Sequence, residues 1–360
     1  MTSRDTEPEP APEPQSADAD AERAYTVVGG GAIGGTLAFH LARAGHPVLV
    51  VDADPAHVAA VEEHGLTLLG PAGESTVRVR ALTPDRAEGP FERVLLCVKA
   101  QATAEAGRWI APRLAADGFV VSLQNGLNER LLGELVGPER TVGAFVNLFA
   151  DVVEPGTVRD GGAGALVVGE MDGRDSERVE QVVADLQAWG PARATPNVPG
   201  YLWSKLGFGA MLTATALADA PMADLIDAHR PLMSALAGEV FAVATALGVT
   251  LEPFDAFDPN GYLPAAEPAQ REAATDRLVA WLRTQPKDRS GIWRDIAVRH
   301  RPTEVPHHYG PVLAAGGAHG LALPLLDAMM RALSRVESGE SAMAEAHLKE
   351  LEAIRTEVAK

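Results

Sequence analysis

The residue with the clearest chemical potential is Lys205. It lies in the stretch 203–209, which is apolar with small residues and which we expect to form a largely buried helix. A buried ammonium group needs a partner or a ligand, and burial lowers its pKa toward the range in which it can act as a general acid. The structural alternative is a lysine whose stem is buried while its ammonium group reaches solvent.

A glycine-rich stretch near the N-terminus has the pattern of a dinucleotide-binding turn. Gly29, Gly31 and Gly34 form G-x-G-x-x-G after a β-branched run that begins at Tyr25. The apolar segment that follows is expected to be a helix. The first glycine allows the tight turn, the second lets a pyrophosphate approach the backbone, and the third lets the helix pack on the strand. Amides at the helix start then face the phosphates. The expected cofactor-binding residues of this turn are Gly29, Gly30, Gly31, Ala32, Ile33 and Gly34.

Asp52 bears on the choice of dinucleotide. It ends the second apolar run, 48–51, and is followed by Ala53 with no basic residue directly after it. A carboxylate there can accept hydrogen bonds from both ribose hydroxyls of NAD, but it would repel the 2′-phosphate of NADP. Asp52 therefore favours NADH over NADPH, the alternative being an ordinary polar residue at a strand end.

Two further candidates, Lys99 and Asn125, each follow an apolar run that reads as a strand. Lys99 comes directly after 94–98, and Asn125 lies in the Gln-Asn-Gly turn after 119–123. The carboxyl ends of the strands in a doubly wound sheet meet at the crevice where ligands bind. The two side chains could contact cofactor ribose, a nicotinamide carboxamide or a substrate carboxylate. Taken alone, each could be an ordinary loop residue. Because both follow the carboxyl end of a predicted strand, a ligand-binding site is favoured.

The last third of the chain holds polar residues with both structural and functional interpretations. Ser290 could cap a helix, Asp295 could pair with a nearby arginine, and Glu304 follows a loop with a proline. His307 and His308 are adjacent, and there is no His-x-x-x-His or cysteine pair, so no metal site is predicted. No serine nucleophile elbow is present either.

Composition excludes several kinds of partner. The chain has 360 residues, enough for two domains, and its net charge of −18 disfavours nucleic acid and anionic membrane surfaces. Cys97 is the only cysteine, so no intramolecular disulfide can form, which suits a reducing compartment. There is no apolar run of membrane length and no signal-peptide core at the N-terminus. We expect a cytoplasmic protein.

The chain divides into three parts. Residues 1–24 are rich in Pro, Glu, Asp and Ala and should form a disordered acidic tail. Residues 25–195 alternate strands with helices, which predicts an α/β Rossmann-type, doubly wound sheet. This part should include a hairpin at 66–80 and strands near 158–159 and 165–168 at the far side of the sheet. Residues 196–360 should be all helical. Helices are expected at 203–218, 231–247, 267–284, 311–317, 325–337 and 341–358.

Together these features resemble the ketopantoate reductase (2-dehydropantoate 2-reductase) family, from Tyr25 to about Gly339. The segments that carry the resemblance are 29–35, 98–100, 124–126, 155–158, 203–206, 301–304 and 318–321 with Pro324. The resemblance implies a two-domain enzyme that reduces a 2-oxo acid with hydride from NAD(P)H. It implies that Lys205 gives a proton to the ketone oxygen and that Lys99 and Asn125 contact cofactor and substrate. It also places Glu304 near the nicotinamide ribose or the substrate.

The resemblance also shows where this chain departs from the family. The family's asparagines four and eight residues after the lysine are here Gly209 and Thr213, and its paired serines are Ser290 and Gly291. An acid and an asparagine expected after Glu304 are Pro306 and Tyr309. These substitutions predict a pocket that is less polar and roomier near Gly209, for a bulkier or more apolar 2-oxo acid or a related carbonyl or imine. The family typically uses NADPH, whereas Asp52 favours NADH.

A noncatalytic NAD(H)-binding sensor or partner-binding module is the alternative function. The lost substrate contacts favour it, whereas the retained Lys205, Glu304 and Gln-Asn-Gly turn disfavour it. The apolar surplus of the helical domain is compatible with a homodimer, although the sequence does not require one.

Overall fold

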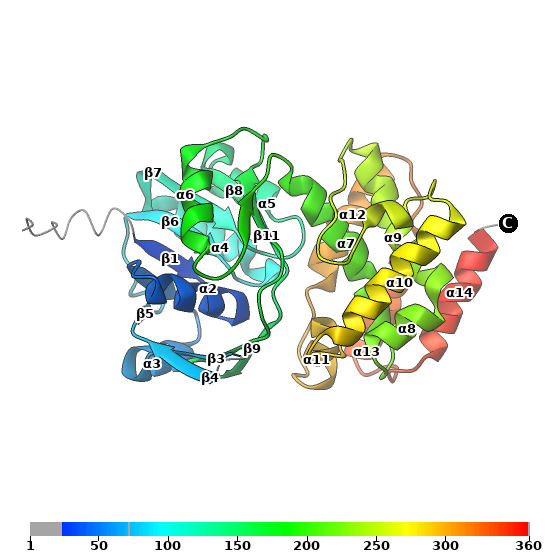
Figure 1. Cartoon of the computed structure of the whole chain (residues 1–360), viewed down its shortest axis with the longest axis horizontal. Helices are drawn as coiled ribbons and strands as arrows, with labels where there is room; N and C mark the ends of the chain where they lie inside the picture. Colours follow the sequence, from blue (N-terminus) through cyan, green and yellow to red (C-terminus); the bar gives the residue numbers. More distant parts are fainter. Residues whose placement is uncertain (1–23, 71–72, 359–360) are drawn as a thin grey trace, which may run out of the picture.

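The computed structural model describes residues 24–70 and 73–358. A domain built on β-sheets, blue to green in Figure 1, is followed along the chain by a helical domain, green to red. The expected fold class, a Rossmann-type α/β domain followed by an all-α domain, is therefore confirmed. The expected acidic tail, 1–24, lies outside the described residues except for Ala24. The proposed domain boundary, at 195/196, falls between the last strand and the first helix of the second domain.

An eight-stranded sheet forms the centre of the first domain. In spatial order its strands are β12 (Ala192–Ala194), β11 (Leu166–Glu170), β8 (Thr141–Val146), β7 (Leu114–Ser122), β6 (Phe91–Leu96), β1 (Tyr25–Val28), β2 (Val48–Val51) and β5 (Arg80–Leu82). The strands from β8 to β5 are parallel, and β11 runs antiparallel to β8. The chain winds outward from β1 in both directions, and ligands bind beyond the carboxyl ends of strands at such a switch point.

Helices cover both faces of this sheet, which is why its strands are apolar without alternation. One face is packed by α2 (Ala32–Arg43), α3 (Pro55–His64) and α6 (Glu177–Leu186). The other face is packed by α4 (Thr103–Ile110) and α5 (Glu129–Val136). The sequence specifies α3 locally, because the side chain of Asp54 accepts a hydrogen bond from the backbone of Ala56 and Pro55 opens the first turn.

A second, four-stranded sheet lies against α2. Its strands, in spatial order, are β4 (Gly73–Val77), β3 (Leu66–Gly70), β10 (Thr157–Asp160) and β9 (Ala150–Glu154). The expected hairpin is present as β3 and β4, but Arg80 leaves it and pairs with Leu49 in the main sheet. The expectation that 158–159 joins the main sheet was wrong. Val158 is fully buried against α2, where a Cβ on Gly35 would lie 2.8 Å from its side chain.

The second domain is built from helices alone. They are α7 (Val198–Thr215), α8 (Met222–Ala228), α9 (Arg230–Ala246), α10 (Pro268–Thr284), α11 (Gly291–Ala297), α12 (Val305–Ala318), α13 (Pro324–Glu337) and α14 (Ala346–Val358). The central one is α7, which is apolar nearly all round because neighbours cover it on most sides. It crosses α9 closely, since a Cβ on Gly207 would lie 2.2 Å from the ring of Phe241.

The first turn of α7 packs directly on the sheet and so joins the two domains. A Cβ on either Gly143 or Gly169 would lie 2.9 Å from the side chain of Val198, so these glycines make room for the helix. One turn further on, the rings of Tyr201 and Phe145 lie 5.5 Å apart. Because Lys205 follows by another turn, this packing positions its side chain at the end of β8.

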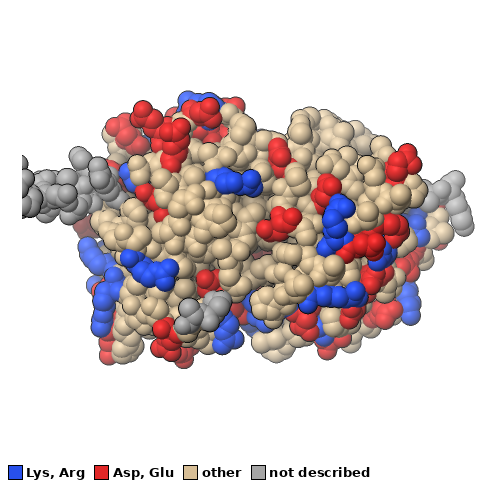
Figure 2. Space-filling model, in the orientation of Figure 1, with Lys and Arg blue, Asp and Glu red and all other residues tan. Residues whose placement is uncertain are grey.

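The surface agrees with an acidic protein. On the face shown in Figure 2, acidic side chains are spread over both domains with basic ones between them. No helix within residues 24–70 and 73–358 is both long and apolar enough to span a bilayer. Nor do those residues bring three potential metal ligands of the His, Cys, Asp or Glu type together.

Candidate active site

The glycine turn between β1 and α2 has the geometry that its sequence predicts. Gly29 has a φ of 95°, and a Cβ on it would lie 2.8 Å from the amide nitrogen of Val98. A Cβ on Gly34 would lie 1.9 Å from the carbonyl oxygen of Gly29, so helix and turn are in direct contact. Gly31 faces open space, since no atom of residues 24–70 and 73–358 lies within 4 Å of its Cβ position. Any larger residue at the first or third glycine would force the turn apart.

These residues fit a dinucleotide. Gly31 is the N-cap of α2, no side chain caps the helix, and its first turn carries no acidic residue. The amide groups of that turn therefore have no partner within the helix and face the open side of Gly31, where the positive end of the helix dipole favours a phosphate. The backbone at this point would hold the pyrophosphate.

Asp52 is fixed at the other side of the same turn. Its Oδ2 accepts a hydrogen bond from the amide of Gly30 at 2.7 Å, and its Oδ1 accepts one from the amide of Asp54 at 2.9 Å. Each carboxylate oxygen can accept a second bond, and the side chain is only half-buried. The carboxylate is thus oriented by the backbone and still able to receive ribose hydroxyls.

Lys99 and Glu304 meet across the domain junction. The ammonium of Lys99 donates to Oε2 of Glu304, and the amide of Ala100 donates to its Oε1 at 2.8 Å. Asp295 lies 3.8 Å from the same ammonium. Burial raises the pKa of the Glu304 carboxyl, but the charge of Lys99 and these hydrogen bonds outweigh burial and bring it below its ordinary value. Glu304 is therefore ionised at neutral pH.

Lys205 lies beside the carboxyl end of β8. Its ammonium donates to the carbonyl of Val146 and sits 5.2 Å from the centre of the Phe145 ring. Burial lowers the pKa of Lys205 to about 8, against the opposing fields of Asp255 and Glu304. An ammonium group with a pKa this close to neutrality both carries a proton and can release it.

The Gln-Asn-Gly turn contributes an unsatisfied amide. Oδ1 of Asn125 is buried and has no hydrogen-bond partner within residues 24–70 and 73–358. A Cβ on the next residue, Gly126, would lie 2.9 Å from the ring of His308, whose Nε2 is also buried and finds no partner in the described part of the chain. Burial lowers the pKa of His308 to about 4, with Glu304 opposing, so the imidazole is neutral. Buried polar atoms without partners are uncommon and suit a site that waits for a ligand.

Nothing in the sequence analysis singled out His308 except as one of two adjacent histidines. It follows Glu304 by four residues, and that spacing places two side chains on one face of a helix. The four-residue spacing from Glu304 was the sequence signal that could have identified His308.

A buried hydrogen-bond network ties the two strand-end loops together. Nε2 of Gln124 donates to the carbonyl of Val98 at 3.0 Å and to Oγ1 of Thr103 at 2.7 Å. Thr103 in turn donates to Asn128, whose amide donates to the carbonyl of Asn125 at 2.7 Å. The loop that carries Lys99 and the loop that carries Asn125 therefore hold each other in place.

The structure corrects one expectation about the pocket. The space beside Gly209 is not free, because a Cβ there would lie 2.8 Å from the hydroxyl of Tyr309, which donates to the carbonyl of Leu206. Thr213 is fully buried, and its hydroxyl donates to the carbonyl of Gly209. The expected roomier pocket at this point was wrong, since the tyrosine occupies the place left by the missing side chain.

Ser290 and Gly291 open α11. The hydroxyl of Ser290 accepts a hydrogen bond from the amide of Trp293 at 3.2 Å, which confirms the predicted helix cap. Asp295 pairs with Arg299 and Arg301, as expected of an acid near arginines. Gly291 is exposed, with no atom within 4 Å of its Cβ position. Lys99, Asn125, Lys205 and Glu304 are thus brought to one region, whereas the hydroxyl of Thr213 is bonded within its own helix, to the carbonyl of Gly209.

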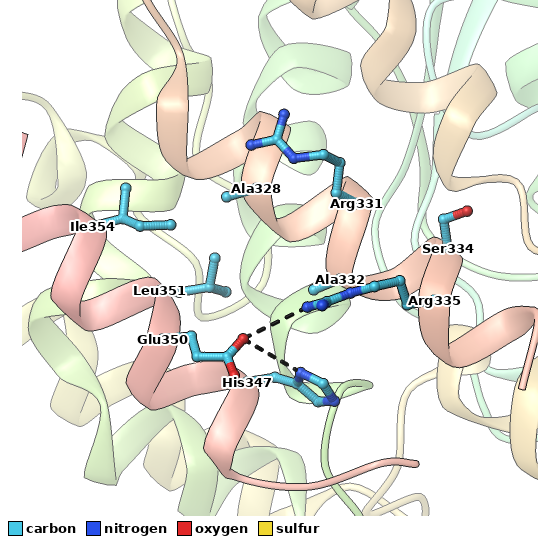
Figure 3. A pocket seen from close by; sticks show the side chains of 9 residues that line it. All are labelled: Ala328, Arg331, Ala332, Ser334, Arg335, His347, Glu350, Leu351 and Ile354. Carbon is cyan, nitrogen blue, oxygen red and sulfur yellow. Dashed lines mark ion pairs between the residues drawn. The ribbon is translucent and has the colours of Figure 1, made fainter. Parts of the chain in front are cut away.

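Two cavities lie outside this region. One, of about 490 Å³, is formed between α13 and α14, where Glu350 pairs with Arg335 at 3.6 Å and with His347 at 3.9 Å (Figure 3). The other, of about 300 Å³, lies between α3 and the second sheet. None of the candidate site residues lines either cavity.

Comparison with known proteins agrees with this geometry. Residues 25–173 match the family model described as ketopantoate reductase PanE/ApbA, and residues 197–337 match the one described as its C terminal. The chain belongs to the ketopantoate reductase family. It is therefore an oxidoreductase of the 2-dehydropantoate 2-reductase type, and α14 lies beyond the matched residues.

Individual relatives of the ketopantoate reductase family cover most of the chain. A 2-dehydropantoate 2-reductase of Mesorhizobium japonicum is 33% identical over 252 residues, which are 62% of this chain and 76% of that protein. One of Halobacterium salinarum is 29% identical over 307 residues, 83% of this chain and 94% of that protein. A crystal structure of a PanE/ApbA family ketopantoate reductase from Ralstonia eutropha is 29% identical, with a TM-score of 0.74 over 88% of this chain and 99% of that one.

Proposed function

We propose that the protein reduces a 2-oxo acid to the 2-hydroxy acid, with the proton supplied by Lys205. The observation that carries this proposal is the half-buried ammonium of Lys205, with its pKa of about 8, beside the carboxyl end of β8 and close to Glu304. A residue that must donate a proton near neutral pH needs such a pKa.

The chemistry divides between the two domains. A reduced nicotinamide, when bound, supplies the hydride. As the carbonyl carbon accepts that hydride, the electron pair of the C=O bond moves to oxygen, and Lys205 stabilises the developing alkoxide and gives it a proton. An ammonium group has three N–H bonds, so Lys205 can keep its bond to Val146 while a second N–H faces the substrate.

Neighbouring residues set the state of Lys205 and the shape of the site. The negative charge of Glu304 favours the protonated lysine and, through Lys99 and the amide of Ala100, holds the loop after β6 against the helical domain. Oδ1 of Asn125, which has no hydrogen-bond partner among the residues that the structure describes, can accept a hydrogen bond from cofactor or substrate. Burial of Glu304 and of the Asn125 oxygen strengthens their electrostatic effect.

For the cofactor we propose a nicotinamide dinucleotide with NADH preferred over NADPH. Asp52 supports that preference, because its oriented carboxylate would accept the 2′-hydroxyl of the adenosine ribose and repel a phosphate in the same place. A homodimer through the helical domain remains a proposal.

The test is to follow NADH absorbance with a panel of 2-oxo acids that includes 2-dehydropantoate. The proposal expects NADH oxidation with at least one member of the panel. Saturable NADH binding without oxidation across the panel would instead support the noncatalytic sensor, which the loss of the asparagines at 209 and 213 favours.

A further inference from the structure

Two lysines of the helical domain reach one short segment of the first domain. Lys205 donates to the carbonyl of Val146, and Lys287, in the loop before α11, donates to the carbonyl of Ala150 at 3.1 Å. The two acceptors are four residues apart, so their Cα atoms lie within about 14 Å of each other even in a fully extended chain. The segment 146–150 therefore runs between two ammonium groups, one of them the proposed proton donor.

The charges around this segment form a continuous cluster. Asp151 pairs with Arg294 and Arg299, and Asp295 pairs with Arg299 and Arg301. Lys99 then connects Asp295 to Glu304, whose field reaches Lys205. The seven cations are Lys99, Arg159, Lys205, Lys287, Arg294, Arg299 and Arg301, and the four carboxylates are Asp151, Asp255, Asp295 and Glu304.

Seven cations against four carboxylates leave the cluster with a net charge of +3, in a chain whose net charge is −18. Lys205, Lys287 and Arg159 account for this excess, because none of the three has an ion-pair partner among residues 24–70 and 73–358; the two lysines donate only to backbone carbonyls. Burial, and then the charges of Arg294 and Arg159, lower the pKa of Lys287 to about 8. A lysine whose pKa is lowered by neighbouring cations is stabilised in its charged form when an anion binds between them.

We propose that Lys287, with Arg159 and Arg294 beside it, binds a second carboxylate of the substrate, so that the substrate is a 2-oxo dicarboxylic acid. This inference rests on the proposed function, because it takes the reacting carbonyl to be at Lys205. The distal carboxylate then lies at the other end of the segment 146–150. This charged contact would take the place of two neutral asparagine side chains of the family, at whose positions this chain has Gly209 and Thr213.

Matched substrate pairs test the proposal. 2-Oxoglutarate and 2-oxopentanoate have chains of the same length and differ in a terminal carboxylate; oxaloacetate with 2-oxobutanoate and 2-oxoadipate with 2-oxohexanoate extend the comparison. In at least one pair the diacid should have a kcat/KM about tenfold or more above that of the monoacid, as a charge-assisted bond would give. No preference for the diacid in any pair would overturn the proposal.

The variant Lys287→Met should remove that preference while monoacid turnover stays unchanged, and Lys287→Arg should keep it. Lys349→Met is the matched control, because it removes the same charge from an exposed position on α14. It should leave the diacid preference intact. An equal loss for both members of a pair in Lys287→Met would show instead that Lys287 supports the fold or binds the carboxylate next to the reacting carbonyl, and thermal unfolding of the variant distinguishes these two outcomes.

Binding without turnover separates this inference from the reductase proposal. Calorimetry with glutarate and pentanoate should show about tenfold tighter binding of the dicarboxylate to the wild-type protein, and equal binding to Lys287→Met. If no 2-oxo acid is reduced but this difference is found, the reductase proposal fails and the anion site stands. If 2-oxo acids are reduced but neither assay shows a preference for two carboxylates, the anion site fails and the reductase proposal stands.

Discussion

The carboxylate of Glu304 and the ammonium of Lys99 form an ion pair that joins the two domains. Glu304 lies just before α12, and Lys99 lies just after β6. Oε1 of Glu304 also accepts a hydrogen bond from the amide of Ala100. The loop after β6 therefore binds both oxygens of the carboxylate. The pair therefore links the strand ends of the first domain to the helical domain that carries Lys205.

Replacing Glu304 with glutamine should lower the pKa of Lys205, because the nearby negative charge that favours its ammonium form is removed. The alkaline limb of the kcat/KM profile should move to lower pH, with a loss of about tenfold above neutral pH. The control is Glu345→Gln, which removes a carboxylate from the exposed surface. An alkaline limb that does not move would show that Glu304 has no influence on the proton donor.

The wild-type protein should lose reductase activity as the pH rises through about 8, where Lys205 gives up its proton. Above that pH, kcat/KM should fall about tenfold per pH unit. No acid limb should appear near neutral pH, because the pKa of Glu304 is held below its ordinary value.

Lys287 also titrates at about 8, so the profile is best measured on Lys287→Met with a monocarboxylic 2-oxo acid. A profile that stays level well above pH 8 in that variant would contradict the assignment of Lys205 as donor.

The pair of Gly209 and Tyr309 allows a stability test. Gly209→Ala would put a Cβ 2.8 Å from the tyrosine hydroxyl, and this overpacking should lower the free energy of unfolding by about 1–3 kcal/mol. Tyr309→Phe removes the oxygen and the bond to Leu206, at a cost of about 1 kcal/mol alone. Denaturant unfolding should show that the double variant loses less free energy of unfolding than the sum of the losses in the two single variants. Simple additivity would place the hydroxyl away from Gly209.

Cofactor preference can be examined at Asp52. The wild-type protein should bind NADH about tenfold or more tightly than NADPH, and Asp52→Asn should narrow this difference by removing the charge that repels a 2′-phosphate. Asp54→Asn is the control, since it removes a neighbouring charge while its side chain can still cap α3. Dissociation constants from cofactor fluorescence give the answer, and tighter binding of NADPH by the wild-type protein would refute the preference.

Sequence patterns were sufficient to predict the features that depend on contacts between residues close together in the chain. The turn at Gly29 to Gly34 and the cap of α11 at Ser290 depend on neighbours within a few residues, and both were predicted. Lys99 and Asn125 could be brought to one crevice because parallel strands end on the same side of a sheet.

Other features depend on contacts between distant segments. The β-branched residues around Val158 predict a strand, but they do not say which sheet it joins, and the partner proved to be β3. The contact of Tyr309 with Gly209 joins α12 to α7, so the sequence alone suggested empty space where a ring lies. The position of Lys287, whose charge has no ion-pair partner in the described part of the chain, is likewise visible only once β9 and α11 are known to face each other.

The most direct test of the account is the rate of hydride transfer in a single turnover of Lys205→Met, measured beside the affinity of the variant for NADH. Loss of the proton donor should slow the transfer about 10²- to 10⁴-fold, while NADH binds as in the wild-type protein. Lys205→Arg should be nearly as slow, because it keeps the charge but holds its proton too tightly. A wild-type rate in Lys205→Met would contradict the central claim that this lysine supplies the proton.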